Sequence, residues 1–597
     1  MTVYGWSTIF AFALVLTALA LPVGRYMAAV YTGEHTFMDR VLGGPERLVY
    51  RALRVDQHRG QDWKAYARSL IAFSIVGWLA LYLIVRTQGL WSFTGLNPMH
   101  YHAMPWNVAF NTVSSFVTNT NWQYYGGETT MSYFSQMAGL TVQNFASAAV
   151  GIAVAVALIR GIVTRVAHSD DADARSIGNF WQDLVRTILY VLVPISLIVA
   201  LILLSRGVIQ NFSHYTTFTG ITHIVQTIAM GPVASQEAIK LVGTNGGGFF
   251  NTNSAHPFEN PTGLTNFVEM LAVLLIPAAL VFTYGRMTGN RRQGYAIYAM
   301  MMLMFLGAAA VCYIAEAHGS PAQHAAGLHT AVRAGSTGGN MEGKEQRFGI
   351  AGSALFNVVT TVTSCGAVNS ALESFTGIGG AVPFANLSAS EVIFGGVGSG
   401  LYSVLLYVLL AVFLGGLMVG RTPEYIGKKI EAREIKLVAL GILITPLAAL
   451  FSTALATATR AGRASIDTAV ASGPQAFSET FYAYLSQANN NGSAFAGYTG
   501  FVQPAAGNVG SHGITFADLL GAFTMLFARY APILFALAVA GTLVNKRVSP
   551  AGLGTMRTDN PTFVVLLIGV VVLVGALTFF PALLLGPIVQ GLTGHLY

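Results

Sequence analysis

Long apolar runs recur along the whole chain and constrain its fold more than any other feature. A helix needs about 20 apolar residues to cross a hydrocarbon core of roughly 30 Å. Ten runs are predicted as membrane-spanning helices, at 6–24, 67–86, 138–159, 181–205, 265–285, 295–315, 390–420, 435–459, 516–544 and 562–588. Only 10% of the 597 residues are charged and 53% are apolar, unlike a soluble domain. The sequence therefore predicts an all-α, multi-pass membrane protein.

The basic residues predict how these helices are oriented. Short loops rich in Lys and Arg stay on the cytoplasmic side of a membrane. With ten spans, 23 of the 32 Lys and Arg residues fall on one side, in the segments 25–68, 160–186, 286–292, 421–436 and 546–557. Both termini are then predicted to face outside. This topology accounts for the net charge of +7 without a nucleic-acid partner.

Four polar tripeptides recur at a nearly constant interval, and their third positions are separated by 125, 120 and 126 residues. They are Asn119-Thr120-Asn121, Thr244-Asn245-Gly246, Ser364-Cys365-Gly366 and Asn490-Asn491-Gly492. All four fall on the predicted outer side. Each follows a stretch too short to span the membrane, at 108–117, 235–242, 350–362 and 477–487. The pattern predicts four units of helix, re-entrant loop and helix.

The unit boundaries follow from these spans and loops. The four predicted pore units are 67–160, 181–286, 295–421 and 435–546. An N-terminal helix with a basic cytoplasmic loop (1–66) precedes them, and a C-terminal helix (562–588) follows them. Four similar loops can surround one axis, so we expect a pseudo-four-fold arrangement.

The chemistry of the tripeptides favours a large monovalent cation. Non-helical backbone at membrane depth must be buried in protein or line water, and a ring of carbonyls can replace the hydration shell of such an ion. Glycine at the third position accepts a positive φ, and Asn121 is the next most tolerant residue. No tripeptide holds a carboxylate, which divalent cations and Na⁺ usually recruit, so K⁺ is the expected ion.

Three acids follow the first three tripeptides and leave two interpretations open. Glu128, Glu259 and Glu373 could form an outer funnel that concentrates cations. They could equally be solvated or cap helices.

Longer strings around the tripeptides carry a family resemblance. They read VTNTNWQYYGGE (117–128), GTNGGGFFNTNSAHPFENPT (243–262), TSCGAVNSALESFTG (363–377), NNNGSAFAG (489–497), SEVIFGGVGSGLY (390–402) and GRTPEYIGKKIE (420–431). These strings resemble the potassium-binding A subunit family (KdpA) of the Kdp potassium-transporting P-type ATPases. The resemblance covers essentially the whole chain.

The resemblance implies a K⁺-channel-like fold with one extra helix at each end, in a bacterial plasma (inner) membrane. It assigns the four tripeptides and Gln123 to a filter that binds K⁺, the transported ion, at the outer face. The partners that it implies are a P-type B subunit, a C subunit and a small single-helix F subunit.

The sequence predicts no catalytic site and no ATP site in this chain. The spacing GxxxxGK at 338–344 resembles a phosphate-binding loop, but Glu345 follows it where Mg²⁺ needs Ser or Thr, and no strand precedes it. The Asp-Lys-Thr-Gly-Thr phosphorylation sequence of P-type ATPases is absent. Energy for active transport would come from another chain.

The run 390–420 is longer than a membrane requires and is rich in glycine near its start. Gly395, Gly396, Gly398 and Gly400 either break the helix to gate the pore or allow close helix packing. Glu391 is a candidate for lining an exit tunnel, and Arg421 for blocking the inner mouth. For both residues an interfacial charge is an equal alternative.

We expect a subunit that binds extracellular K⁺ and delivers it to an ATP-driven partner. The alternative is a stand-alone K⁺ channel or a transporter of the Trk or Ktr type. An intramembrane enzyme would need a nucleophile and a base, or metal ligands, within the spans, and the sequence offers no such constellation.

Overall fold

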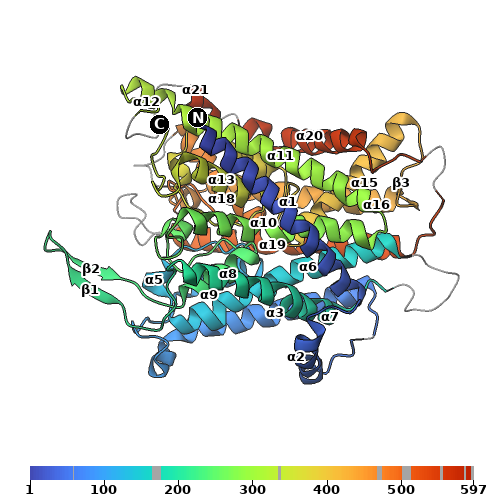
Figure 1. Ribbon diagram of the computed structural model, residues 1–597, viewed down its shortest axis with the longest axis horizontal. Helices are drawn as coiled ribbons and strands as arrows, with labels where there is room; N and C mark the ends of the chain where they lie inside the picture. Colours follow the sequence, from blue (N-terminus) through green and yellow to red (C-terminus); the bar gives the residue numbers. More distant parts are fainter. Residues whose placement is uncertain are drawn as a thin grey trace.

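Long helices dominate the structure (Figure 1). The computed structural model describes residues 1–57, 59–164, 176–333, 338–466, 473–499, 512–550, 555–583 and 586–592. Ten helices in these ranges are long and apolar enough to cross a membrane. They are α1 (Val3–Thr32), α3 (Trp63–Thr87), α6 (Val142–Val163), α7 and α8 (Phe180–Arg186 and Val193–Ser205, one span), α10 (Gly263–Met287), α11 (Arg291–His318), α15 (Ser399–Val419), α16 (Ala432–Ala458), α19 (His512–Val544) and α20 (Pro561–Leu583). The multi-pass helical architecture is confirmed.

Two predicted spans differ from the observed helices. The run 390–420 was expected to be helical throughout, but α15 begins only at Ser399. Left-handed backbone at Glu391, Phe394, Gly395 and Gly398 excludes a helix before that point. The last run, 562–588, corresponds to α20, which ends at Leu583, and to the start of α21 (Gly586–Leu592), and residues 584 and 585 lie outside the described ranges.

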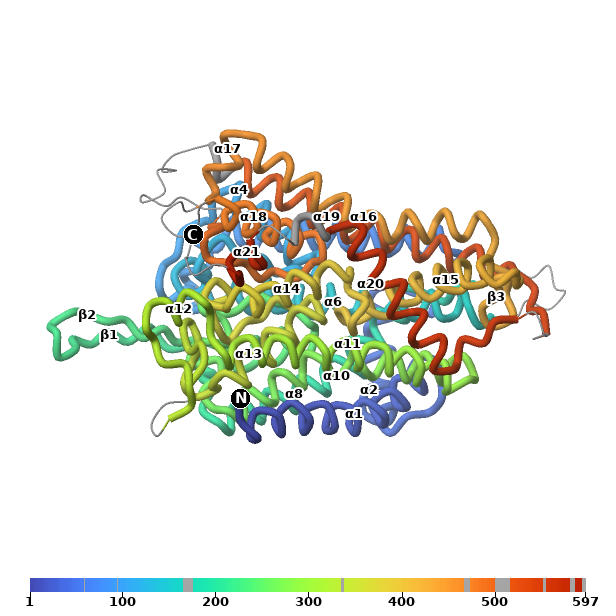
Figure 2. Tube along the Cα trace, turned by 90° about the horizontal axis from the view of Figure 1, so that it is seen from above, coloured from blue at the N-terminus to red at the C-terminus, as the bar shows by residue number. Residues whose placement is uncertain are grey.

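Four short helices precede the four polar tripeptides, as predicted. They are α4 (Trp106–Val117), α9 (Val233–Val242), α13 (Gly349–Val362) and α18 (Gly473–Ala488). Their lengths of 12, 10, 14 and 16 residues are below the roughly 20 that cross a bilayer. All four lie toward the end of the molecule at which α1 begins (Figures 1 and 2).

The remaining elements are short and lie mainly at the two ends of the long helices. The short helices are α2 (Asp39–Leu53), α5 (Gly127–Thr130), α12 (Pro321–Ala325), α14 (Gly377–Ser388) and α17 (Arg460–Arg463). β1 (Thr216–Thr219) pairs antiparallel with β2 (Val225–Ile228), and β3 (Glu424–Tyr425) pairs with β4 (Lys428–Lys429). The β1–β2 hairpin projects from one end, and β3 lies at the opposite end (Figure 2).

The core is centred on α6, whose side chains are buried on all faces. A helix that is apolar all round belongs in the interior. Small residues allow close neighbours: a Cβ on Gly161 would lie 2.6 Å from the Cα of Ala540 in α19. By contrast, α1 and α3 expose large apolar side chains such as Leu14 (70% exposed) and Leu83 (63%). These outer helices present a surface suited to lipid.

Candidate functional site

The four short helices end in the same backbone motif. In a Schellman motif, a left-handed residue follows the helix, and the next N–H bonds to a carbonyl five residues earlier. The left-handed residues are Asn119 (φ 70°), Thr244 (50°), Ser364 (49°) and Asn490 (52°). The bonds run from Thr120 to Ser115 (2.9 Å), Asn245 to Lys240 (2.9 Å), Cys365 to Thr360 (2.9 Å) and Asn491 to Ser486 (2.8 Å). The motif therefore recurs at the first and second positions of all four tripeptides.

The sequence did not reveal this motif, because none of the four left-handed residues is glycine. Thr244 is β-branched, for which a positive φ is unfavourable. Such backbone strain persists only where surrounding structure enforces it and is common at functional sites.

The third positions behave differently from one another. Asn121 (φ 58°), Gly366 (86°) and Gly492 (102°) are left-handed, as expected, whereas Gly246 is not. Glycine is needed at Gly246 for space instead, because a Cβ there would lie 2.5 Å from the carbonyl oxygen of Cys365. The prediction of a positive φ at every third position is wrong for this loop.

The four tripeptides, which we call the four-loop cluster (119–121, 244–246, 364–366 and 490–492), lie next to one another. The first reaches the second, where the Asn119 amide donates to the Thr244 carbonyl at 3.1 Å. The second meets the third, where the Cys365 thiol donates to the Asn245 carbonyl at 3.2 Å.

The same contacts continue around the cluster. A Cβ on Gly366 would collide with the Asn491 carbonyl, so the third and fourth loops touch. The fourth loop returns to the first, where the Asn490 amide donates to Thr120 Oγ1 at 2.9 Å. The contacts thus run in chain order and close on themselves.

The cluster is buried and electrically neutral. Asn245, Cys365 and Asn491 are fully buried, and none of the twelve residues carries a charge. The side-chain oxygens of Asn121, Asn245 and Ser364 have no hydrogen-bond partner among the described residues. The C-termini of four helices also meet here, and a helix C-terminus carries a partial negative charge. This environment suits a cation.

Gln123 lies just beyond the cluster and links two of its loops. Its side-chain carbonyl accepts a bond from the Gly248 N–H at 3.1 Å, and its amide donates to the Tyr125 hydroxyl at 3.1 Å. It therefore connects the segments that follow the first and second tripeptides.

A buried ionic cluster supports the second loop. The Lys240 ammonium lies 2.7 Å from Glu237 and 3.6 Å from Glu259, and all three side chains are at most 1% exposed. Lys240 also donates to Asn253 at 3.1 Å, and the Asn253 amide donates to the Gly246 carbonyl at 2.6 Å. The buried charges are thereby connected to the backbone of the four-loop cluster.

Glu269 completes this ionic cluster. Its side chain is fully buried and interacts electrostatically with Lys240 and Glu237. Sequence reasoning did not identify the ionic cluster, although the isolated Lys240 in a short, mainly apolar helix was a signal for it.

The three outer acids do not share one role. Glu259 belongs to the ionic cluster and is fully buried, so it does not line an outer mouth. Glu128 accepts a bond from the Asn251 N–H at 2.9 Å, and Glu373 interacts electrostatically with the buried Glu479. Nearby, His256 stacks on Phe250 at 3.8 Å, and burial lowers the pKa of His256 to about 4.

The glycine-rich segment 391–398 lies against the four-loop cluster. The Val397 N–H donates to Thr244 Oγ1 at 3.0 Å, and the Gly395 N–H donates to the Val362 carbonyl at 2.9 Å. Gly398 packs directly on the backbone of Gly151 in α6. The segment is therefore both non-helical and closely packed, and its role as a gate stays a prediction.

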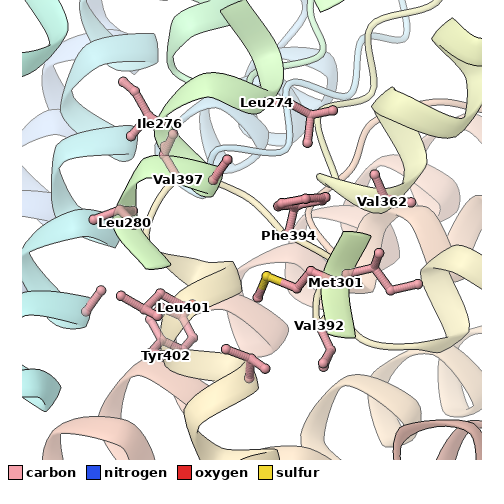
Figure 3. Close-up of a cluster of buried hydrophobic side chains, with 14 of the residues drawn as sticks. Leu274, Ile276, Leu280, Met301, Val362, Val392, Phe394, Val397, Leu401 and Tyr402 are labelled. Carbon is pink, nitrogen blue, oxygen red and sulfur yellow. The ribbon is translucent and has the colours of Figure 1, made fainter. Parts of the chain in front are cut away.

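Apolar side chains anchor this segment on its other side. Phe394 is 1% exposed and belongs to a cluster of buried apolar side chains that includes Met301 and Val362 (Figure 3). Val392 and Val397 join the same cluster of buried side chains (Figure 3). These side chains made the run look like one continuous helix in the sequence.

Three of the four candidate gate residues lie in one segment, and the fourth lies far from it. Glu391, Gly396 and Gly398 belong to the glycine-rich segment, and a Cβ on Gly396 would lie 3.4 Å from Thr244 Oγ1. Arg421 is exposed beyond the far end of the 21-residue α15, about 30 Å along the helix axis. Sequence reasoning missed Arg529, which is 3% exposed in α19 and interacts electrostatically with Glu391.

Comparison with known proteins agrees with this geometry. The model of the family described as potassium-transporting ATPase A subunit matches residues 10–592. The chain belongs to this family. A relative from Methylobacterium nodulans is 52% identical over 594 residues, covering 100% of this chain and 98% of the relative. One from Mesorhizobium japonicum is 50% identical and covers 99% of both. Both relatives are named potassium-transporting ATPase potassium-binding subunit.

A solved structure shares the fold. The potassium transporter TrkH from Vibrio parahaemolyticus superposes with a TM-score of 0.50, covering 90% of this chain and 98% of TrkH. The two sequences are 14% identical, so the likeness concerns the fold alone.

Proposed function

We propose that this chain is the potassium-binding, selectivity-filter subunit of an ATP-driven K⁺ uptake complex. The observation that carries the proposal is the four-loop cluster, in which four identical helix ends meet in a closed order of contacts. The family relatives bear the name of a potassium-binding subunit.

The proposed filter is pseudo-four-fold and re-entrant, and Asn119, Thr120, Asn121, Thr244, Asn245, Gly246, Ser364, Cys365, Gly366, Asn490, Asn491 and Gly492 bind the ion. Gln123 lies at the outer edge of this filter and holds its first two loops together. Carbonyls and amides replace the hydration shell of K⁺, and four helix C-termini add a favourable potential without a fixed carboxylate. A neutral site of this kind favours K⁺ over divalent cations.

The proposed topology places the cluster on the outer side of a bacterial plasma membrane, with both termini outside. The ten spans and the concentration of basic residues on one side support it. The pore units then run over 67–160, 181–286, 295–421 and 435–546. Glu391, Gly396 and Gly398 form a gate below the filter, and Arg421 lies at the inner end.

The complex would contain a P-type B subunit that hydrolyses ATP, a C subunit and a small F subunit. This chain has no phosphorylation sequence of its own, so the partner supplies the energy. The fold shared with TrkH keeps a stand-alone channel or a Trk/Ktr-type transporter as the second candidate.

Substitution of Gly366 tests the filter assignment. A Cβ at this left-handed position meets the Asn491 carbonyl, so Gly366→Ala should displace a carbonyl proposed to bind K⁺. We expect the K⁺ concentration for half-maximal ATPase activity of the assembled complex to rise at least about 10-fold, equivalent to about 1.4 kcal/mol. Gly307→Ala is the matched control, because no heavy atom lies within 4 Å of its added Cβ.

An unchanged K⁺ dependence in Gly366→Ala would refute the filter. The second candidate is tested separately with the chain alone in liposomes. Robust K⁺ flux without partner subunits or ATP would favour the channel or Trk/Ktr alternative, whereas its absence supports the subunit role.

A further inference from the structure

Three arginines from three membrane helices line one shallow pocket. The pocket is formed by Arg25 and Leu21 of α1, Arg286 and Phe282 of α10, and Arg291 and Tyr295 of α11. It lies where α10 ends and α11 begins, at the end of the molecule away from the β1–β2 hairpin (Figures 1 and 2). We call these six residues the arginine pocket.

Close helix packing beside the arginines fixes their relative positions. Next to Arg25, Gly24 packs on α10, where a Cβ would lie 2.6 Å from the Ala279 carbonyl oxygen. The Thr283 hydroxyl donates to the Gly24 carbonyl at 3.1 Å. Next to Arg286, a Cβ on Gly285 would lie 3.1 Å from the Cα of Gly294 in α11. The pocket is therefore built on a tightly packed three-helix junction.

The three guanidinium groups have no acidic partner in the described part of the chain. Two other arginines at this end are paired, Arg160 with Asp183 at 2.6 Å and Arg186 with Glu46 at 2.9 Å. Three convergent positive charges without a counter-charge repel one another and favour a bound anion. Arginine suits an oxyanion because its planar group forms paired hydrogen bonds with phosphate.

The apolar part of the pocket indicates that this anion has a hydrophobic body. Leu21 and Phe282 line the pocket beside the arginines. Leu14 is 70% exposed and lies 11 residues before Arg25, on nearly the same face of α1. Tyr295 is 49% exposed, and tyrosine favours the boundary between headgroups and hydrocarbon.

We propose that the arginine pocket binds the phosphate of an anionic phospholipid, whose acyl chains lie along the exposed side of α1. Basic pockets between membrane helices bind lipid headgroups in this way. The bound lipid would neutralise the pocket and join α1 to the α10–α11 turn.

Lipid titration of the complex purified in neutral detergent with its partner subunits tests this proposal. Native mass spectrometry would count bound dioleoylphosphatidylglycerol and dioleoylphosphatidylcholine. Wild-type complex should retain the anionic lipid at lower concentration than the zwitterionic one. In R25Q/R286Q/R291Q the binding of the anionic lipid should weaken by roughly 10-fold or more, because three charges near the headgroup are lost.

The matched control R40Q/R292Q/R433Q removes three exposed arginines outside the pocket, which changes the net charge equally. It should change lipid affinity less than about two-fold, a small fraction of the effect expected for pocket charges. Equal weakening in both triple variants, equal retention of the two lipids, or displacement of the lipid by equimolar inorganic phosphate would overturn the proposal.

Two further variants keep the test informative if the triple glutamine variant does not assemble. R286Q alone should weaken binding of the anionic lipid, and R25K/R286K/R291K should retain more of it than R286Q, because lysine keeps the charge. Wild-type binding by R286Q would overturn the proposal.

Discussion

The second and fourth loops of the four-loop cluster share a backbone motif but are supported by different chemistry. Behind the second loop lie Lys240 and three carboxylates, all buried. Neutral hydrogen bonds hold the fourth loop, where the Asn490 amide donates to Thr120 and the Ser486 hydroxyl accepts a bond from the Gly492 N–H at 3.0 Å. A repeated backbone geometry therefore does not require a repeated set of supporting side chains.

Substitutions among the side chains that support the two loops should also lower the stability of the protein by different amounts. Removing one member of a buried ion cluster leaves uncompensated charge, which destabilises a protein by about 3–5 kcal/mol. Losing a neutral buried hydrogen bond costs about 1–3 kcal/mol. Substitutions behind the second loop should therefore have the larger effects.

The largest effect is expected for Lys240→Met. This change leaves Glu237 and Glu259 without their cation, so the free energy of unfolding of the purified complex should fall by about 3–5 kcal/mol. Chemical unfolding in detergent measures it, with the exposed Lys436→Met as control. Glu269→Gln should be neutral or stabilising, because three carboxylates share the one Lys240 ammonium and this change removes an excess negative charge. Equal stability of Lys240→Met and its control would remove the contrast between the loops.

A smaller effect is expected for Asn490→Gly in the fourth loop. Glycine tolerates the φ of 52° but loses the bond to Thr120, so the cost should be about 1–3 kcal/mol. Asn490→Ala should cost about 1 kcal/mol more, because alanine is strained in the left-handed region. The same unfolding measurement separates the cost of the lost hydrogen bond from the cost of the backbone strain. If both variants lose as much stability as Lys240→Met, the two loops are supported equally strongly, and the proposed difference between them is refuted.

Much of the fold could be predicted from local sequence. Ten spans follow from apolar runs of sufficient length, and the four short helices follow from weakly apolar stretches before the tripeptides. The start of α15 could not be predicted, because Val392, Phe394 and Val397 kept the run apolar while their side chains fill a core from a non-helical segment.

The four tripeptides of the candidate site were expected to lie together, but the side chains that hold them in place were not predicted. The tripeptides converge as expected. The left-handed backbone at Thr244 and Ser364 could not be predicted, because neither residue is glycine. Glu259 and Glu269 lie 19 and 29 residues from Lys240, so only the folded chain brings them together. Arg421 was expected at the cytoplasmic end of the run 390–420, and it does follow the end of α15 that lies away from the glycine-rich segment.

The central claim is that the four-loop cluster binds K⁺. Anomalous scattering from Tl⁺, a K⁺ substitute, in a structure of the assembled complex tests it most directly. We predict a peak on the axis of the cluster, surrounded by backbone carbonyls of residues 119–121, 244–246, 364–366 and 490–492, and weaker occupancy in Gly366→Ala. Bound Tl⁺ elsewhere in the chain, with none at the cluster, would contradict the account.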